Sequence, residues 1–346
     1  MRSYETGQYA VLKDGNFQLV MARAMASNFS FIHVAIPEDC SDEAELRELY
    51  QGRDLGHKSI NFVKMKYGKN AVETREQFWK LNAKEIYMWE MSKRFDIIVS
   101  DITGYKKHEF GFQHVIYNFN ITKLPELDRP YIDKFFETDL KSIEDSLFTT
   151  VINPRQREYI LEVRPDLINK VIAHTKIAHE RMLPKGMAGN NPAKMIFWPF
   201  RISDKAYEWI QFLEAFEEQG LDKDGWIILA TDPNDTLETD ASFVMQIKPT
   251  KEEYYQILAA RPIIVMLDDI DTVLHPGTIE FLHYKCPIIT YKSKLIDNPN
   301  AIGNLNQLDT ALDNLRYTTI DASPFVYGLT EVDQYLNTTY IDVLSN

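Results

Sequence analysis

The sequence has few cysteines and no long apolar run, and each absence excludes a class of protein. Its 346 residues include only two cysteines, Cys40 and Cys286, too few for a disulfide scaffold or a zinc ribbon. The longest apolar stretches, 226–230 and 262–267, are strand-sized, whereas a membrane helix needs roughly 18–20 apolar residues. The first residues lack the basic and then apolar pattern of a signal peptide. We therefore expect no membrane span and a reducing, cytoplasmic setting, in the host cell if the protein is viral.

Basic residues are scarce in the second half of the chain. The whole chain carries a net charge of −13. Residues 1–180 contain 25 Lys and Arg against 27 Asp and Glu, whereas residues 181–346 contain 13 against 24. An acidic half disfavours nonspecific binding to a phosphate backbone. Residues 51–100 contain 10 basic and 6 acidic residues, so a local basic face is expected in the N-terminal half.

Strand-like and helix-like segments alternate along the chain. The 45% hydrophobic content excludes wholesale disorder, and the length suggests about two domains of roughly 150 residues. Short β-branched runs predict strands, and apolar residues at helical spacing predict helices. The expected strands are 29–36, 95–101, 114–119, 147–152, 171–174, 194–200, 226–231, 243–247, 263–267 and 287–291. The expected helices are 16–27, 73–94, one from residue 155, 206–219, 250–260 and 278–285.

Three residues mark expected helix ends. Thr74 precedes a Glu-containing turn and predicts a capping box, and Thr250 predicts an N-cap. Gly220 predicts a C-terminal stop.

This alternation predicts parallel sheets with helices on both faces. Residues 181–193 contain two Gly, two Pro and two Asn, a composition typical of a linker. We therefore predict an α/β protein with two Rossmann-like doubly wound domains that face a cleft. The predicted domains are residues 1–180 and 194–325, and a last helix within 326–346, near 331–336, is expected to pack back on the first domain.

Two cations follow the first expected strand of the second domain. Arg201 and Lys205 lie four residues apart, just before the next helix, at the strand end where open α/β sheets bind ligands. Fixed cations beside a helix N-terminus suit a diphosphate. The alternative is a solvated loop with Lys205 in the first helical turn, and spacing alone favours that alternative.

A Gly-Thr pair and a glutamate follow farther along. Gly277 and Thr278 are expected to open a helix, where free backbone N–H groups attract anions. Glu280 is expected in the first helical turn, where a carboxylate can accept two hydroxyls of a ribose, and His275 is expected to line the same site. The alternative is a glycine that suits the turn and a glutamate that suits the helix dipole, and the two interpretations stand about even.

Three motifs in the second domain follow a known order. Residues 200–201 with Lys205 give an Arg and a Lys after a strand, and residues 252–255 give Glu-Glu-Tyr-Tyr on a helix. Glu280 then precedes residues 286–289, Cys-Pro-Ile-Ile. This order resembles the nucleotide-sugar domain of GT-B glycosyltransferases, a family with two Rossmann-like domains that holds the donor mainly in the second.

Two positions depart from the family's pattern. Phe200 stands where the family has Gly, and Thr272 stands where it has the first of two acidic residues. Asp269 or Asp271 is a candidate substitute for that acidic residue.

The first domain resembles the same family. Residues 95–101 resemble its Asp-apolar-apolar strand, and residues 149–160 resemble its segment of a strand followed by Ser-x-x-x-Arg. Asn118 and Asn120 stand in the region where the family often has a His.

The resemblance implies transfer of a hexosyl or pentosyl group from a nucleotide-diphosphate sugar, expected to be a UDP-sugar, to a hydroxyl acceptor. Glu280 is then expected to bind the ribose, and no metal or other cofactor is required. The leaving diphosphate is assigned to Arg201, Lys205 and the helix start at Gly277 and Thr278.

The base and the acceptor site are expected in the first domain. Asp101, at the carboxyl end of strand 95–101, is the candidate base, although a cap or loop role is the favoured alternative from the residue alone. The candidate acceptor-binding residues are Lys106, Lys107, Asn118 and Asn120.

A narrower likeness suggests one acceptor. Residues 119–125 and 200–203 resemble phage glucosyltransferases that modify hydroxymethylated bases in DNA, which makes such DNA a candidate acceptor through the N-terminal domain. Basic residues interleave with Phe62 and Tyr67 over 58–75, as in a nucleic-acid groove, but a charged surface loop is the favoured alternative there.

Two functions of other classes fit the same sequence. The two-domain fold also hosts sugar-nucleotide epimerases, which need further acid/base carboxylates and no acceptor. A non-catalytic nucleotide-sugar-binding protein is the second alternative, and it is compatible with the departures at Phe200 and Thr272. Donor hydrolysis distinguishes the binding protein, and acceptor dependence distinguishes the transferase from the epimerase.

Overall fold

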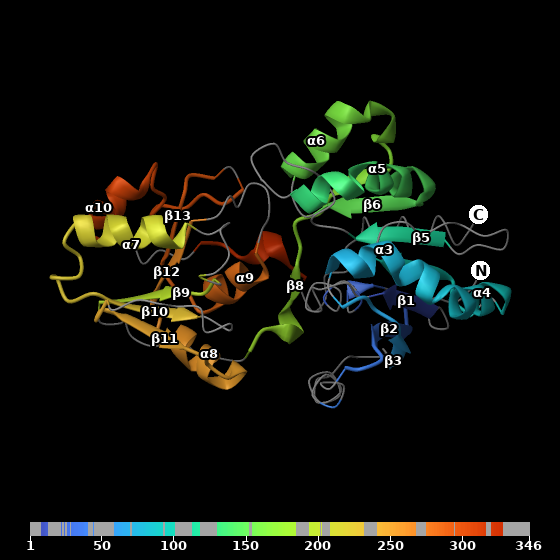
Figure 1. Ribbon diagram of the computed structural model, residues 1–346, viewed down its shortest axis with the longest axis horizontal. Helices are drawn as coiled ribbons and strands as arrows, with labels where there is room; N and C mark the ends of the chain where they lie inside the picture. The colour runs from blue at the N-terminus through green and yellow to red at the C-terminus, as the bar shows by residue number, and fades with distance from the viewer. Residues whose placement is uncertain are drawn as a thin grey trace. The chain divides into compact units, whose positions relative to one another are not determined.

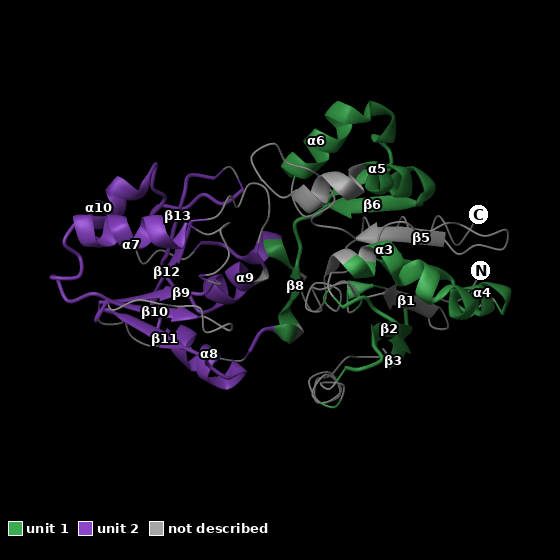
Figure 2. Ribbon diagram, viewed as in Figure 1, with its two compact units in different colours: residues 1–182, 325–346 green, residues 183–324 purple. Residues whose placement is uncertain are grey.

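Two compact units make up the protein. They are residues 1–182 with 325–346, and residues 183–324 (Figure 2). Each unit contains one parallel sheet in doubly wound strand order, so the predicted pair of Rossmann-like units is confirmed. The computed structural model describes residues 8–12, 22, 24, 26–27, 29–40, 44, 59–69, 71–92, 94–100, 113–117, 130–151, 154–184, 194–200, 202, 208–231, 241–267, 275–293, 295–315 and 320–327.

The first unit is built on a seven-stranded sheet in the order β3-β2-β1-β4-β5-β6-β7, with every described pair parallel (Figure 1). Its strands are β1 (Gln8–Leu12), β2 (Phe31–Pro37), β3 (Ser59–Met65), β4 (Ile97–Ser100), β5 (Gln113–Tyr117), β6 (Phe148–Val151) and β7 (Val171–Ala173). Its longer helices are α3 (Ala71–Leu81), α4 (Ala83–Met91), α5 (Pro130–Asp145) and α6 (Pro154–Val163). The strand order reverses between β1 and β4, which places the topological switch point of this sheet there.

Two inner strands of this sheet, β4 and β6, are buried on both faces. All residues of β4 and β6 are buried, as expected for parallel strands covered by helices. One apolar cluster joins the α3–α4 layer to the sheet and contains Phe78, Ile86, Trp89, Phe95 and Ile98.

The expected helix over 73–94 is in fact two helices, because Asn82 interrupts it. The Asn82 side chain is 2% exposed. Its Oδ1 accepts from the Lys66 backbone N–H at 2.9 Å and its Nδ2 donates to the Lys66 carbonyl at 2.8 Å. The amide therefore fixes the end of β3 to the junction of α3 and α4.

The capping box predicted at Thr74 is wrong, because α3 already begins at Ala71. Thr74 Oγ1 instead accepts from the backbone N–H of Gly68 at 3.0 Å, and Glu73 Oε2 accepts from that of Lys69 at 2.9 Å. A Cβ on Gly68 would lie only 2.4 Å from the Thr74 nitrogen, so this close approach requires glycine.

Residues 59–65 form the edge strand β3, which the sequence analysis missed in favour of a charged surface loop. The Tyr67 ring lies 5.0 Å from that of Phe78, and the Tyr67 hydroxyl donates to the Ala35 carbonyl at 3.4 Å. The tyrosine is thus packed against the core. Strand β1 and helix α5 were also missed.

The second unit carries a five-stranded parallel sheet in the order β11-β10-β9-β12-β13. Its strands are β9 (Met195–Trp198), β10 (Ile227–Thr231), β11 (Val244–Ile247), β12 (Ile263–Met266) and β13 (Ile288–Thr290). Its helices are α7 (Trp209–Glu218), α8 (Lys251–Ala259), α9 (Pro276–His283) and α10 (Leu308–Asp313). Each predicted strand of this unit is found, within three residues of its expected bounds.

Helices cover both faces of the second sheet: α7 and α10 lie on one side and α8 and α9 on the other (Figure 1). Adjacent residues of β9 face opposite layers. The Trp198 ring stacks on Phe212 of α7 at 4.8 Å, whereas the Phe197 ring lies 5.9 Å from Tyr254 of α8. Helices α8 and α9 lie on the same face of the sheet, and their side chains are in contact there.

The helix ends of the second unit follow the sequence. Thr250 and Glu253 form a reciprocal capping box at the start of α8, and Gly220 follows α7 with φ +72°, the left-handed conformation that favours glycine. Both predictions are confirmed.

The chain end returns to the first unit. The Ile177 N–H donates to the Phe325 carbonyl at 2.9 Å, and β14 (Val326–Tyr327) pairs with β8 (Ala178–His179). The expected last helix near 331–336 and the linker residues 185–193 lie outside the described residues.

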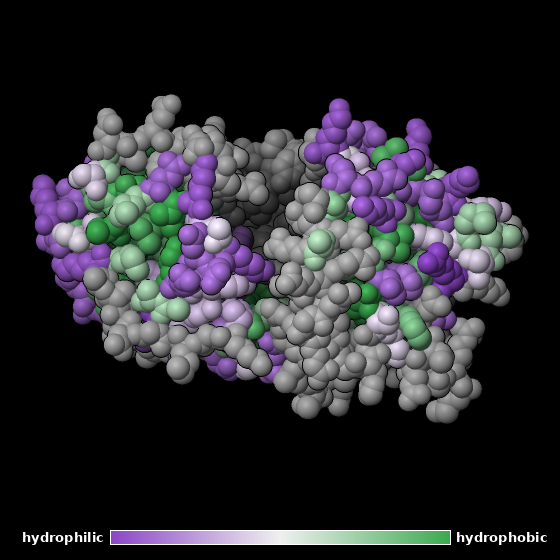
Figure 3. All heavy atoms as spheres, turned by 90° about the horizontal axis from the view of Figure 1, so that it is seen from below, coloured by the Kyte–Doolittle hydropathy of each residue, from purple (hydrophilic) through white to green (hydrophobic). Residues whose placement is uncertain are grey.

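Apolar side chains reach the surface in places. Ile210 is 65% exposed and Met245 is 51% exposed, and Figure 3 shows apolar residues among hydrophilic ones on the face of the second unit at the left of that view. No described helix is long and apolar enough to cross a membrane.

Candidate functional site

The candidate site lies at the switch point of the second sheet. Strands β9 and β12 are parallel neighbours there. Open α/β sheets bind ligands where the connections that leave two adjacent strands run to opposite faces of the sheet. The segment after β9 carries Phe200, and the segment after β12 ends at His275. Their rings meet edge to face with centroids 5.2 Å apart. Two segments that lie far apart in the sequence are therefore in contact at the carboxyl edge of the sheet.

His275 is the N-cap of α9. Its Nδ1 accepts from the Gly277 N–H at 3.1 Å, and an accepting Nδ1 leaves the ring proton on Nε2. Burial lowers the pKa of His275 to about 4, so the ring is neutral near pH 7. The site therefore offers a neutral Nε2–H donor.

The helix start differs from expectation, since the N–H groups of Gly277 and Thr278 are not free. The first donates to His275 Nδ1, and the second donates to the His275 carbonyl at 2.9 Å. Thr278 is 1% exposed and its Oγ1 contacts Met266 Sδ at 3.8 Å, so its hydroxyl is turned to the core. The prediction of free backbone N–H groups here is wrong because the preceding histidine already caps them.

Gly277 lies close to the side chains of His275 and Phe281. A Cβ on this residue would lie 3.1 Å from His275 Nδ1 and 3.2 Å from the Phe281 ring. A side chain here would therefore require the capping ring to give way by a few tenths of an ångström.

Glu280 lies in the second turn of α9 rather than the first, because the helix already begins at Pro276. It is half-buried, and both oxygens of its carboxylate accept from tyrosines of α8. The Tyr254 hydroxyl donates to Oε2 at 3.0 Å, and the Tyr255 hydroxyl donates to Oε1 at 3.1 Å. The sequence indicated these tyrosines only as part of a motif. Their contact with Glu280 depends on α8 and α9 sharing one layer.

The surroundings of Tyr254 keep its hydroxyl protonated. Burial, and then the negative charge of Glu280, raise the pKa of Tyr254. The Tyr284 ring stacks on Tyr255 at 6.1 Å. Cys286 is buried, its Sγ donates to the Leu258 carbonyl at 3.4 Å, and burial raises the pKa of this thiol to about 12. Tyr254 therefore remains a donor to the carboxylate.

A second carboxylate–tyrosine pair lies at the same edge and was missed from the sequence. Glu208, the N-cap residue of α7, accepts from the Tyr291 hydroxyl at 2.5 Å. Tyr291 directly follows β13, so this bond fixes the start of α7 to the end of that strand. Burial raises the pKa of Tyr291.

Seven other predicted site residues lie outside the described residues: Asp101, Lys106, Lys107, Asn118, Asn120, Arg201 and Lys205. Asp101 directly follows β4, which borders the switch point of the first sheet. Within the described ranges, no three His, Cys, Asp or Glu side chains are grouped as metal ligands.

Comparison with known proteins gives a clear result for the fold. No family model and no curated protein sequence matches the chain. The structure of the Anabaena protein HepE in complex with UDP-glucose has a TM-score of 0.61 and 10% identity, and covers 98% of this chain and 99% of that one. The structure of S. aureus MnaA with UDP has a TM-score of 0.57, 8% identity, and coverage of 99% and 98%.

A glycosyltransferase from Rickettsia africae has a TM-score of 0.54 and 11% identity, with coverage of 98% and 94%. At such identities the likeness concerns the fold. The chain has the two-unit fold of GT-B glycosyltransferases, as the sequence resemblance implied.

Proposed function

We propose that the protein is a glycosyltransferase that transfers a sugar from a nucleoside-diphosphate sugar, a UDP-sugar, to a hydroxyl acceptor. The observation that carries this proposal is the contact of Phe200 with His275 at the switch point of the second sheet. It brings the segment that leads into Arg201 and Lys205 to the helix that carries Glu280. The complexes of HepE with UDP-glucose and of MnaA with UDP support the choice of donor.

On the donor side, each residue has a distinct role in the proposal. Glu280 accepts the ribose hydroxyls through its carboxylate, which the Tyr254 and Tyr255 hydroxyls hold in place. The His275 Nε2–H donates to an oxygen of the diphosphate. Arg201 and Lys205 neutralise the charge that develops on the leaving diphosphate.

Gly277 and Thr278 support the donor site indirectly. Gly277 admits the capping ring of His275, and Thr278 anchors the first turn of α9 in the core. Their N–H groups are satisfied, so their share in binding the anion is the dipole of the helix start.

On the acceptor side, the proposal rests on the sequence. An inverting transfer needs a base that removes the proton from the acceptor hydroxyl, and Asp101, after β4, is the candidate. Lys106, Lys107, Asn118 and Asn120 are the candidate acceptor contacts. Hydroxymethylated DNA is one acceptor to test, although none of the three structures reported above is described as acting on DNA.

Thermal unfolding with a panel of nucleoside diphosphates tests the proposal. A ligand that binds only the folded protein at a hundredfold excess over its Kd adds about 2.7 kcal/mol of stability. We expect UDP to raise the melting temperature of the wild type and not that of Arg201→Ala. Arg164→Ala, which removes a surface arginine of the first unit, is the matched control and should keep the response.

If no nucleoside diphosphate raises the melting temperature of the wild type, the proposal is contradicted. If UDP binds, turnover of the UDP-sugar separates the alternatives. A transferase needs an acceptor, an epimerase converts the donor alone, and a binding protein leaves the donor intact.

A further inference from the structure

Phe200 and His275 form a pair of rings that joins two segments of the second unit. Their centroids lie 5.2 Å apart and their planes meet at 88°. In such an edge-to-face contact the positive edge of one aromatic ring meets the negative face of the other, which is a preferred arrangement. Phe200 is 2% exposed, and its ring also meets that of Trp198, at 6.3 Å and 89°. The Phe200 ring is therefore fixed in the core while it contacts the histidine.

The capping bond at the start of α9 requires one form of the His275 ring. Nδ1 accepts from the Gly277 N–H at 3.1 Å, and only a ring without a proton on Nδ1 can accept. Protonation of the imidazole would place two donors opposite each other and break the cap. The geometry therefore ties three properties together: the cap, the uncharged ring and the tautomer with its proton on Nε2.

Burial favours this same form of the ring. It lowers the pKa of His275 to about 4, and no charged group among the described residues contributes to the shift. Two charged residues neighbour the ring pair in the sequence, Arg201 directly after Phe200 and Glu280 farther along α9. Phe200 is also a position at which the sequence departs from the GT-B pattern, so the ring pair is a feature of this chain.

We propose that Phe200 is a positioning residue that holds the His275 imidazole in its capping orientation, so that a fixed and uncharged Nε2–H group meets the diphosphate of the donor. This inference rests on the proposed function and adds to it the residue that determines how the diphosphate is recognised. Phe200 acts through His275. A donor group that is already oriented favours binding because little conformational freedom is lost when the ligand arrives.

A pH titration of His275 by NMR tests the positioning role without any ligand. Comparison with His275→Asn assigns the signals of the ring. We expect the wild-type ring to titrate near pH 4. In Phe200→Ala, which exposes the imidazole to solvent, the midpoint should rise by about one pH unit or more, toward the ordinary value near 6.5. Phe200→Leu keeps an apolar side chain in place and should lie between the two.

Titration calorimetry with UDP-glucose tests the consequence for the donor site. Both phosphates of this probe are esterified, so its charge stays constant where histidine titrates. The wild-type affinity should not change as the pH falls through about 6.5, the ordinary pKa of histidine. In Phe200→Ala the affinity should be about tenfold lower at neutral pH, because the donor group is no longer fixed. It should then increase as the freed imidazole gains its positive charge, and adding His275→Asn should remove that increase.

Two controls separate the packing of the rings from other causes. Phe243→Ala removes a ring that stacks on Phe216 of α7 at 5.3 Å, and it should change neither the titration of His275 nor the affinity. Arg201→Ala should leave the midpoint near pH 4, because burial rather than charge sets it. A midpoint that rises as far in Arg201→Ala as in Phe200→Ala would contradict the inference.

The remaining outcomes separate this inference from the proposed function. If His275 still titrates near pH 4 in folded Phe200→Ala and Phe200→Leu, the positioning role is wrong, whatever the protein binds. If the midpoint rises but the wild type does not bind UDP-glucose, the proposed function fails while the positioning of the ring stands. Should Phe200→Ala unfold, Phe200→Leu gives the same decision, because a purely structural role lowers its melting temperature without moving the midpoint.

Discussion

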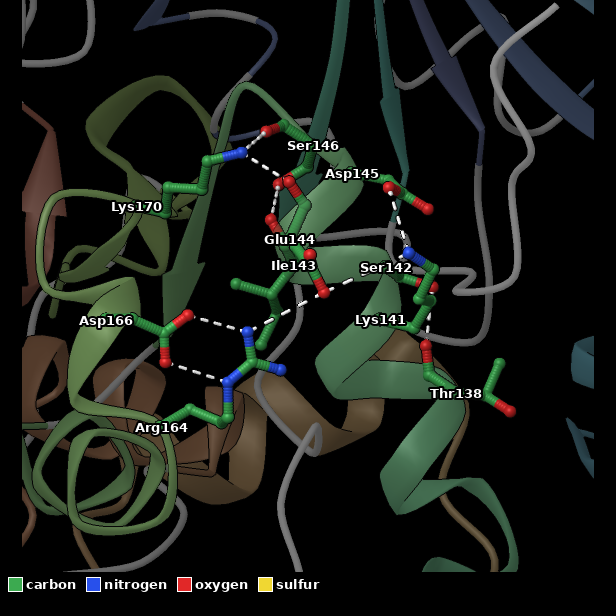
Figure 4. Close-up of polar contacts among 10 residues, drawn as sticks. All are labelled: Thr138, Lys141, Ser142, Ile143, Glu144, Asp145, Ser146, Arg164, Asp166 and Lys170. Carbon is green, nitrogen blue, oxygen red and sulfur yellow. Dashed lines mark hydrogen bonds and ion pairs between the residues drawn. The ribbon is translucent and has the colours of Figure 1, made fainter.

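The two units hold carboxylates with different kinds of partner: cations in the first unit and neutral hydroxyl groups in the second. At the amino edge of the first sheet, the Arg164 guanidinium binds Asp166 through two bonds of 2.8 and 2.6 Å, and also lies 3.6 Å from Glu144 (Figure 4). In the second unit, Glu280 is held by the neutral hydroxyls of Tyr254 and Tyr255. The first group lies on the surface, and the second is half-buried beside a switch point.

The cluster around Arg164 and Lys170 has a structural role at the end of a helix. Lys170 donates to the carbonyls of Glu144 and Ser146, the latter at 2.8 Å, and so closes the C-terminal end of α5 (Figure 4). The exposed ion pairs of Arg164 with Asp166 and Glu144 contribute little to stability. In the first unit, therefore, cations complete the end of a helix at the amino edge of the sheet. In the second unit, tyrosines orient a carboxylate near the carboxyl edge of its sheet. The edge of the sheet and the nature of the partner together distinguish a candidate ligand site from a structural cluster.

The largest expected effect is the loss of nucleotide binding in Glu280→Gln. The amide replaces an acceptor by a donor, and hydrogen bonds to a charged group contribute about 1.5–3 kcal/mol, so UDP affinity should fall roughly 10- to 100-fold. Titration calorimetry measures it. Glu144→Gln is the control and should leave affinity unchanged. Equal losses in both variants would remove the distinction between the two groups.

The next effect is a pH dependence of stability that arises from His275. Its folded pKa of about 4 lies below the ordinary value near 6.5, so the unfolded state binds the proton first as the pH falls. Stability is therefore full above about pH 6.5 and decreases toward pH 4, by roughly 2–3 kcal/mol. Urea unfolding across this range should show a shallower decrease in His275→Asn. Identical profiles would show that the ring is not buried as described.

At neutral pH, His275 contributes through its capping bond. His275→Ala removes the acceptor for the Gly277 N–H and should lower stability by about 1 kcal/mol. Asparagine is a favoured N-cap, so His275→Asn should recover most of this loss while still lacking the Nε2–H donor. We expect both variants to bind UDP weakly. Normal UDP binding by the asparagine variant would exclude a donor role for the ring.

The smallest effect is expected at the surface group. Lys170→Met removes the bonds to the two carbonyls at the end of α5 and should lower stability by roughly 0.5 kcal/mol. Turnover and UDP affinity should not change. A loss of activity with an intact fold would give this cluster a functional role and contradict the comparison.

Much of the fold could be predicted because its signals are local. Strands such as 263–266 are short apolar runs, and the Thr250–Glu253 capping box and Gly220 act within a few residues. The break at Asn82 could not be predicted, because its amide bonds to Lys66, sixteen residues away. Apolar spacing continues across the break and predicts one helix.

The candidate site could be predicted only in part, for the same reason. The sequence indicated His275, Gly277 and Glu280 from their order on one helix. It did not indicate that a histidine caps that helix, since histidine is an uncommon N-cap. Nor could it pair Tyr254 and Tyr255 with a glutamate 26 and 25 residues away, because that pairing depends on how two helices pack on one face of the sheet.

A crystal structure of the protein with UDP tests the central claim most directly. The account predicts the ribose hydroxyls on the Glu280 carboxylate, with both tyrosine hydroxyls still bonded to it, and the diphosphate within hydrogen-bond distance of His275 Nε2. UDP bound elsewhere, or bound with its ribose away from Glu280, would contradict it.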